Sequence, residues 1–368
     1  MKSMKIGKQI AAALILMSLV GCSQEVMDGN SSTIRFSMGG RIDLTTRGII
    51  DQALVNDEIV PVRVTATRGG STLYSNEQLY RDEVTSEWLP RESNQQDWEA
   101  GVRHTFIANA YSPSTAVSSG ALTISSPTSI TVTQPETYDS SSKEGMVDYL
   151  LSQNFVYTVP VGSQPPIVRL EMEHAMSLVE INIAKHVSFE NVNVYLEEVR
   201  LEGFYRSAKM ECPTPAQYGN VAGETNSDVW QYWVMGSTDA IYEINGANPY
   251  PSVTADCVPL KLKEDEGGVR MCFLAPPQQL ESSCRLHVSY WVNEKYSDES
   301  LDNYVYHQST FNLFNYATSG GLAIWLPGHH VVYTLEVDTG IHIEGTISPW
   351  IDVDYIEGTV LPDVTDPY

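Results

Sequence analysis

The chain is poor in basic residues. Its 368 residues include 22 Lys and Arg against 46 Asp and Glu, which gives a formal net charge of −24. Binding to a phosphate backbone depends on clustered Lys and Arg, so we exclude nucleic acid as a partner. An acidic excess keeps an exposed protein soluble, and it carries little information about fold.

Long hydrophobic runs are scarce as well. The run Ile10–Val20 is too short for a transmembrane helix, which needs about 20 apolar residues. Three lysines precede it, and the small residue Gly21 and then Cys22 follow it. This order is typical of a secretory signal peptide, which we place at residues 1–21. The rest of the chain contains no second hydrophobic segment and is expected to lie outside the membrane.

The segment Leu19–Cys22 predicts a lipobox. A signal peptidase would cut before Cys22, and acyl chains would join its thiol and its new amine. Each buried methylene contributes about 0.8 kcal/mol, so several chains on one residue give a stable anchor. The alternatives are an ordinary signal peptide with a chance cysteine and a transmembrane helix.

Cysteine is rare after position 22. The four that remain are Cys212, Cys257, Cys272 and Cys284. Disulfides are allowed in an exported protein, and four cysteines permit three pairings, which the sequence leaves open. No C-x-x-C spacing is present, so a zinc site is not expected.

Catalytic motifs are absent too. The sequence has no G-x-S-x-G elbow, no H-E-x-x-H and no phosphate-binding glycine loop, so we predict neither an enzyme nor a cofactor. Neighbours on a strand point to opposite faces, so His329 and His330 are interpreted as a solvated turn and not as a metal site. His174 is expected to be a structural histidine. Asp352 and Asp354 are interpreted as a solvated strand face.

Alternation of apolar and polar residues is the dominant pattern. It is the period of a β-strand, and it recurs at 34–38, 60–66, 104–111, 178–183, 192–196, 286–291 and 331–337. Gly, Pro, Ser and Asn bound these short runs, as in β-sandwiches. We therefore predict an all-β protein of two tandem β-sandwich domains with few short helices.

Several intervening segments are assigned separately. Residues 143–151 are predicted to form a short helix, because Met146, Tyr149 and Leu150 have helical spacing. The Ser-, Thr- and Pro-rich stretch 112–137 is predicted to be a loop with one edge strand, 129–133. Residues 214–250 are expected to form a long loop.

Two consecutive prolines mark the expected domain boundary. Pro165 and Pro166 have no N–H to donate and cannot continue a strand ladder. We place the join between 160 and 175, which gives an N-terminal domain of residues 48–167 and a C-terminal domain of residues 168–357. A tail of residues 358–368 follows.

The order of these segments resembles the fimbrillins, the subunits of type V pili in Bacteroidia. After the lipobox, the segments that carry the resemblance are Thr33–Met38, Leu44–Gly48, Val62–Ala66, Phe106–Pro113, Leu170–Val179, Leu326–Gly328 and Ile347–Trp350. They span nearly the whole mature chain. The resemblance implies two transthyretin-like β-sandwiches in a lipoprotein that is exported to the outer membrane.

The resemblance also implies proteolytic processing. An arginine-specific or trypsin-like protease would remove a propeptide of residues 22–47. Arg47–Gly48 matches the cleavage motif, and Arg41 is the second choice. Cleavage would release the first strand, whose apolar residues are Ile34, Phe36 and Met38.

Donor-strand exchange would then join the subunits. A lost strand leaves an apolar slot flanked by unpaired backbone groups, and a neighbour's strand can restore both. Ile347–Tyr355 is the candidate donor region, with Ile351, Val353 and Tyr355 as the apolar residues of the donor strand, and the alternative is that it forms the last strand of the second sandwich. The tail from Gly358 is acidic, short and contains two prolines, so it suits a tip or accessory subunit.

The expected partners are other pilin subunits, the outer membrane through the lipid before processing, and receptors on host or bacterial surfaces. The alternative function is a permanently anchored lipoprotein that binds glycans through Trp230 and Trp233. The N-terminus of the mature protein separates the two, because a start at Gly48 favours assembly and an acylated Cys22 favours the anchor.

Overall fold

The prediction of an all-β protein is confirmed. The computed structural model describes residues 32–40, 60–135, 146–211, 233–235, 240–244, 258–262, 269–293, 304–314 and 324–349. The named elements include two three-residue 3₁₀ helices, η1 (Glu92–Asn94) and η2 (Val187–Phe189), and all other named elements are strands. In this part of the chain no helix has the length and apolarity that crossing a bilayer requires.

The first half forms a nine-stranded sheet in the order β3-β2-β6-β9-β11-β1-β5-β4, with β10 paired to β6. Its strands are β1 (Phe36–Gly40), β2 (Arg63–Arg68), β3 (Ser71–Gln78), β4 (Tyr80–Arg81), β5 (Trp88–Leu89), β6 (Arg103–Ser112), β9 (Asp148–Ser152), β10 (Phe155–Thr158) and β11 (Val168–His174). Every pairing is antiparallel except that of β1 with β11. The sheet encloses a cluster of buried side chains, called here the first core, which includes Ile34, Phe36, Val64, Phe106, Leu150 and Leu170.

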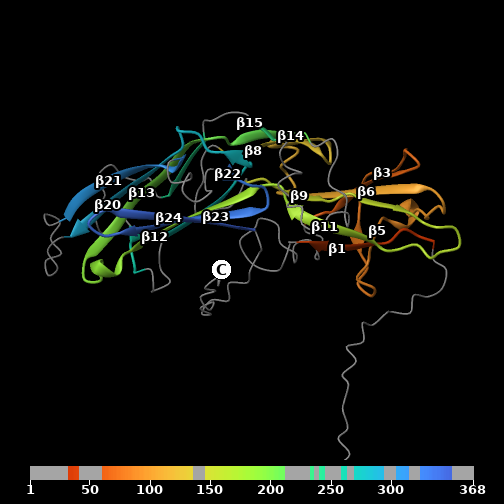
Figure 1. Cartoon of the computed structure of the whole chain (residues 1–368), viewed down its shortest axis with the longest axis horizontal. Coiled ribbons are helices and arrows are strands. Elements are labelled where there is room, and N and C mark those ends of the chain that lie inside the picture. The colour runs from red at the N-terminus through yellow and green to blue at the C-terminus, as the bar shows by residue number, and fades with distance from the viewer. Residues whose placement is uncertain are drawn as a thin grey trace, which may run out of the picture.

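The second half is built mainly from two sheets that face each other (Figure 1). One contains β18 (Val269–Ala275), β12 (Ser177–Lys185), β23 (His329–Val337) and β24 (Ile341–Pro349), in that order. The other runs β16 (Ala240–Ile244), β13 (Asn193–Phe204), β20 (Arg285–Asn293) and β21 (Tyr304–Asn312), with β17 (Val258–Pro259) also paired to β13. A short pair, β19 (Gln278–Gln279) and β22 (Ile324–Trp325), completes this half.

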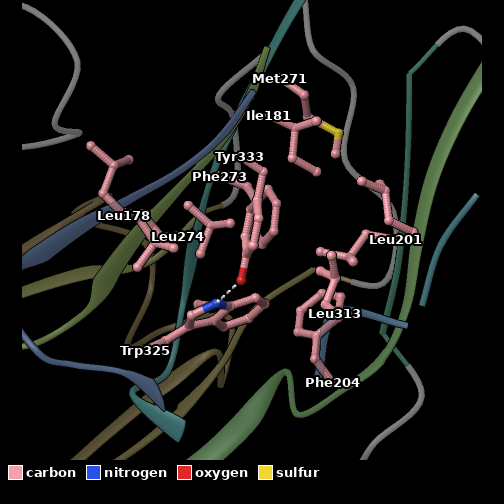
Figure 2. Packing of buried hydrophobic residues seen from close by; sticks show 14 of the residues in the cluster. Leu178, Ile181, Leu201, Phe204, Met271, Phe273, Leu274, Leu313, Trp325 and Tyr333 are labelled. Atoms are coloured by element: carbon pink, nitrogen blue, oxygen red, sulfur yellow. Dashed lines mark hydrogen bonds between the residues drawn. The ribbon is translucent and has the colours of Figure 1, made fainter. Parts of the chain in front are cut away.

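Aromatic rings fill the centre of the second core, the buried cluster of this half (Figure 2). The indole N–H of Trp325 donates a hydrogen bond of 3.0 Å to the hydroxyl of Tyr333, and both side chains are fully buried. Phe204 lies edge-on to Trp325, with 5.4 Å between ring centroids. Tyr and Trp can be buried in this way because each finds a partner for its polar atom.

A fourth sheet joins the two halves. It has the order β15 (Trp233–Met235), β14 (Ser207–Glu211), β8 (Ser129–Thr133) and β7 (Leu122–Ser126). The strands β7 and β8 come from the first half of the sequence, and β8 pairs along its whole length with β14. In Figure 1 this sheet lies above the junction between the two sandwiches. The halves are therefore connected by a continuous backbone ladder and not only by a linker.

Buried polar groups reinforce this junction. The Gln134 side chain donates to the Val147 carbonyl (2.7 Å) and accepts from the Val147 N–H (2.9 Å), and the Gln134 N–H donates to the Arg206 carbonyl. His174 is buried as well, with its Nδ1 3.0 Å from a carboxylate oxygen of Asp148. Because unpaired buried polar groups are costly, such contacts specify one arrangement of the two halves.

The helix predicted for residues 143–151 is wrong, because β9 occupies Asp148–Ser152. This strand pairs with β6 on one side and with β11 on the other. Tyr149 belongs to the second core and Leu150 to the first, so neighbouring residues face opposite ways, as in a strand. A short apolar run buried on both faces cannot be distinguished from a helix by periodicity.

Three further local predictions are corrected. Residues 129–133 form β8, which lies inside its sheet and not at an edge. The predicted loop 214–250 contains β15 and β16. His329 and His330 begin β23 and not a solvated turn, and the Nε2 atom of His330 lies 3.0 Å from the Glu180 carboxylate. In all three cases, pairing with strands that are distant in the sequence decided the structure.

The strand β11 also differs from its expected assignment. The second domain was expected to begin at residue 168, but β11 pairs with β1 and β9 in the first sheet. The sheet changes between β11 and β12, after His174. Pro165 and Pro166 interrupt a ladder without ending the sandwich, because the chain re-enters the same sheet directly after them.

Candidate functional site

The candidate site is the position that β1 occupies in the first sheet. β1 runs parallel to β11, with Phe36 opposite Val168 and Gly40 opposite Met172. On its other side it pairs with β5 at one position only, Phe36 with Trp88. β11 is thus the main backbone partner of β1, and β5 covers it only briefly.

Two side chains of this segment are completely buried. Ile34 and Phe36 have no exposed surface and belong to the first core. The Phe36 ring packs edge-on against Phe106, with 5.7 Å between centroids, and against Tyr74 at 6.2 Å. Fully burying an Ile or Phe side chain contributes about 1.5–3 kcal/mol each. Met38, the third residue of the predicted set, is half-buried at the rim of the same core.

Backbone hydrogen bonds extend this attachment beyond the strand itself. The Ile34 N–H donates to the Gln96 carbonyl (2.9 Å), and the Val168 N–H donates to the Arg35 carbonyl (2.8 Å). The Trp98 N–H donates to the Ser32 carbonyl (2.8 Å). The segment is therefore held from Ser32 onward and is not a tether passing over the surface.

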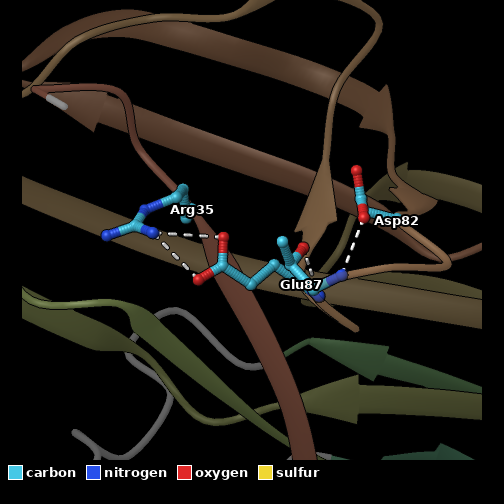
Figure 3. A network of polar contacts seen from close by, with 4 residues as sticks. Arg35, Asp82 and Glu87 are labelled. Carbon is cyan, nitrogen blue, oxygen red and sulfur yellow. Dashed lines mark hydrogen bonds and ion pairs between the residues drawn. The ribbon is translucent and has the colours of Figure 1, made fainter. Parts of the chain in front are cut away.

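A partly buried ion pair holds the outer side of the segment (Figure 3). The Arg35 Nη1 atom donates to both carboxylate oxygens of Glu87, at 3.0 and 3.3 Å. The exposed fractions are 22% and 17% for the two side chains, so solvent screens this pair only in part. Glu87 is itself positioned by a turn, because its carbonyl accepts a hydrogen bond from the Asp82 N–H.

The chain order gives this geometry its significance. Both candidate cleavage residues, Arg41 and Arg47, follow β1 and precede β2 in the sequence. Cutting the chain at either one would leave β1 attached by non-covalent contacts alone. Its departure would expose the β11 ladder edge and the space that Ile34 and Phe36 fill.

The other predicted site residues lie outside the described residues. These are Cys22, Arg47, Gly48, Ile351, Val353 and Tyr355, together with Cys212, Cys257 and Trp230. Of the remaining cysteines, Cys284 is a buried thiol that takes part in no disulfide, and burial raises its pKa to about 12. Cys272 is half-buried on β18. The described residues contain no group of three potential metal ligands.

Sequence reasoning identified Ile34 and Phe36 but not their surroundings. Trp88, Tyr74 and the parallel partner β11 are far away in the sequence, and no local pattern connects them to β1. Arg35 carried a weak signal, since it is a single charge between two apolar positions of an alternating run. Its partner Glu87 could not have been chosen among the many carboxylates of the chain.

The chain was compared with protein-family profiles and with curated proteins. The profile of the fimbrillin-like family matches residues 46–350. No curated relative matches the chain.

Several solved structures resemble the chain, and three of them are fimbrial proteins. A fimbrial protein from Bacteroides vulgatus has 14% identity and a TM-score of 0.44, over 86% of this chain and 99% of its own. A fimbrial assembly protein from Parabacteroides distasonis has 10% identity and a TM-score of 0.39, over 88% and 97%. The C-terminally truncated tip fimbrial protein Mfa3 from Porphyromonas gingivalis has 9% identity and a TM-score of 0.39, over 86% and 98%.

Proposed function

Because the chain belongs to the fimbrillin-like family, we propose that it is a structural subunit of a surface pilus that assembles by donor-strand exchange. In this proposal a protease cuts after Arg47, and the lipidated segment that contains β1 departs. A strand from a neighbouring subunit then takes the place of β1 in the first sheet. The function is adhesion through a polymer and not catalysis.

One observation carries the proposal. β1 is an integral strand of the first sheet, yet it precedes both candidate cleavage residues and forms a long ladder on one side only. Cleavage therefore turns an internal strand into a separable one. The match to the family profile starts at residue 46, after β1.

The incoming strand must reproduce what β1 supplies. It needs a backbone that pairs with Val168–Met172 and apolar residues at alternate positions to replace Ile34 and Phe36. A shift of one residue would turn the apolar side chains outward, so the alternation sets the register. Ile351, Val353 and Tyr355 have the same spacing as Ile34, Phe36 and Met38, which makes the segment after β24 our candidate donor.

The proposed route to the surface is lipidation. Acylation of Cys22 would anchor the uncleaved subunit in the outer membrane, and cleavage would free it for assembly into a fimbrium. The acidic tail from Gly358, with two prolines, is a poor ladder strand. If the C-terminal segment does not donate a strand, the subunit can only accept one and would take a tip or accessory position. Truncation at Gly358 tests this role, because unchanged assembly would show that the tail is irrelevant.

Protease treatment of the lipidated chain tests the central proposal. An arginine-specific protease should produce a fragment that starts at Gly48, followed by polymers visible as a detergent-resistant ladder. The double variant Arg41→Lys/Arg47→Lys keeps the charges but removes both candidate cleavage residues, so it should abolish both products. Arg41→Lys is the matched control and should change neither.

A competing peptide tests the exchange step itself. A synthetic peptide of residues 32–40 should suppress polymer formation, because it can refill the slot left by β1. The same peptide with Ile34 and Phe36 replaced by Ser should have no effect. Polymers that form from uncleaved chains with β1 still in place would contradict the proposal.

A further inference from the structure

An apolar row crosses the outer face of the second sandwich. Tyr195 on β13 lies opposite Trp291 on β20, which lies opposite Tyr306 on β21. Residues directly opposed in an antiparallel sheet share one face. Pro259 on β17 lies on the other side of Tyr195 and extends the row across a fourth strand.

This row faces away from the core. The neighbours of these residues along each strand, such as Val194 and Val292, belong to the second core, whereas Tyr195, Trp291 and Tyr306 do not. Tyr306 is 46% exposed, Pro259 is exposed, and Tyr195 and Trp291 are half-buried. Aromatic surface is therefore open to solvent across three adjacent strands.

The rings hold one another in place. Trp291 and Tyr306 have ring centroids 5.1 Å apart, and Tyr195 contacts Tyr304 edge-on at 5.6 Å. Tyr304 is two residues from Tyr306 on the same strand and thus on the same face. A packed set of rings loses little conformational entropy on binding, which favours recognition by a preformed surface.

Polar groups border the rings on one side. Glu198, Ser289 and Gln308 form the next row across the three strands, and Glu197 lies at the bulge in β13. Burial raises the pKa of Glu197. Ser289 is buried, so the Glu198 carboxylate and the Gln308 amide are the groups within reach of a ligand on the rings.

The next row on this face contains Arg200, His287 and Thr310, whose side chains already contact one another or their neighbours. The Nε2 atom of His287 lies 2.9 Å from the Glu202 carboxylate, and its Nδ1 lies 2.9 Å from the Thr310 hydroxyl. Arg200 lies 3.5 Å from Glu198 and 3.7 Å from Glu202. The side chains of that row are therefore held by contacts within the sheet.

We propose that the aromatic row Tyr195, Trp291, Tyr306, with Tyr304, is a binding platform for a neutral glycan. Sugar rings present apolar C–H faces that stack on aromatic side chains and hydroxyls that donate to carboxylate and amide oxygens, the combination found in ligand sites. The strands are spaced about 4.8 Å apart, so the row offers successive stacking positions to successive sugar units. The acidic border disfavours anionic glycans.

This platform is distinct from the pair Trp230 and Trp233 considered from the sequence. Trp233 belongs to β15 in the sheet that joins the two halves, and Trp230 lies outside the described residues. The platform is also remote in sequence from β1, so it can be tested without assembly.

A glycan array probed with the full, unprocessed chain tests the proposal. Neutral glycans should be bound, and sialylated ones should be bound more weakly or not at all. Titration with the best neutral oligosaccharide should then show an affinity loss of roughly tenfold for Tyr306→Ala and for Trp291→Ala. Unchanged unfolding midpoints of the variants would show that the loss is local.

Tyr80→Ala is the matched control, because Tyr80 is a partly exposed aromatic residue on the first sandwich. It should bind as the unmodified chain does. Three results would overturn the proposal: no neutral glycan is bound, binding persists in both platform variants, or the platform binds only a cationic peptide such as oligolysine. None of these depends on whether the chain forms pili.

Discussion

The first strands of the two sandwiches, β1 and β12, are similar in placement and different in attachment. Each pairs in parallel with a late strand of its own sandwich, β1 with β11 and β12 with β23. β12 has nine residues and is bounded by long ladders on both sides, with β18 and with β23. β1 has five residues and a long ladder on one side only.

Under the proposed strand exchange, this difference would let the first sandwich replace a strand while the second stays closed. Removing β12 would break two ladders in the middle of a sheet. The segments that connect β12 to β11 and to β13 contain no arginine at which a protease of this kind could cut. Removing β1 breaks one ladder and one pairing, and a single cut in the chain that follows β1 would separate it from the rest of the sandwich. We therefore expect the second sandwich to be permanent and the first to be replaceable.

The largest expected effect is on the free energy of unfolding. Here Phe36 of β1 is compared with Ile181, a fully buried residue of β12. Phe36→Ala should lower the free energy of unfolding of the uncleaved chain by about 3–5 kcal/mol, and Ile181→Ala by about 2–5 kcal/mol. After cleavage and assembly, the Phe36 variant should match the unmodified polymer, because β1 has left. Denaturant unfolding before and after protease treatment measures both.

The Ile181 variant should stay destabilised in the polymer and thus serves as the control. A Phe36→Ala polymer as destabilised as its uncleaved precursor would mean that β1 remains in the sheet.

The second prediction concerns Tyr333, whose hydroxyl accepts from the buried Trp325 N–H. Tyr333→Phe leaves that donor unsatisfied and should reduce stability by about 1–3 kcal/mol. The reduction should be equal in monomer and polymer, because this core does not open. Tyr80→Phe, which alters an exposed hydroxyl, should change little, and a smaller loss for Tyr333→Phe in the polymer would argue against a permanent second sandwich.

The third prediction concerns the ion pair that holds the β1 segment. Arg35→Ala removes a partly buried pair worth up to about 1 kcal/mol, so after cleavage the β1 peptide should dissociate roughly fivefold faster. Release can be followed by chromatography of the cleaved protein over time. Arg200→Ala removes a pairing on the second sandwich and should leave the release rate unchanged, whereas equal acceleration by both variants would show a nonspecific effect.

The smallest expected effect is a change in the pKa of Tyr74 when β1 is removed. Burial raises the pKa of Tyr74, which packs against Phe36, from 10.0 to about 12. A raised pKa means that the neutral phenol favours the closed state, so this contribution is complete below pH 10 and is lost as pH rises through about 12. With β1 removed, Tyr74 should titrate nearer to 10.

Ultraviolet difference spectra between the unmodified chain and Tyr74→Phe isolate this transition from the other tyrosines. Burial also raises the pKa of Tyr333, and that residue should titrate alike with β1 present or removed. An unchanged Tyr74 transition after release of β1 would mean that the slot closes when it is emptied.

The alternation of apolar and polar residues correctly predicted strands that are buried on one face only. Alternation placed Ile34 and Phe36 on the buried side of a strand, and both are fully buried. The same reasoning failed at 143–151, because β9 is buried on both faces and so lacks a one-sided pattern. It failed at 129–133 because the partner that turns an apparent edge strand into an inner one, β14, lies far away in the sequence.

The amino-acid sequence alone determined that this protein is all-β, and it predicts an exported chain with a detachable apolar strand ahead of two arginines. These properties follow from composition, period and residue order, which are local. Only the tertiary structure decided that β1 pairs in parallel with β11, that β8 and β14 join the two halves, and that four aromatic residues meet on one outer face. Each of these depends on strand pairings between distant segments, and such pairings are selected by the packing of the whole core, which no local pattern records.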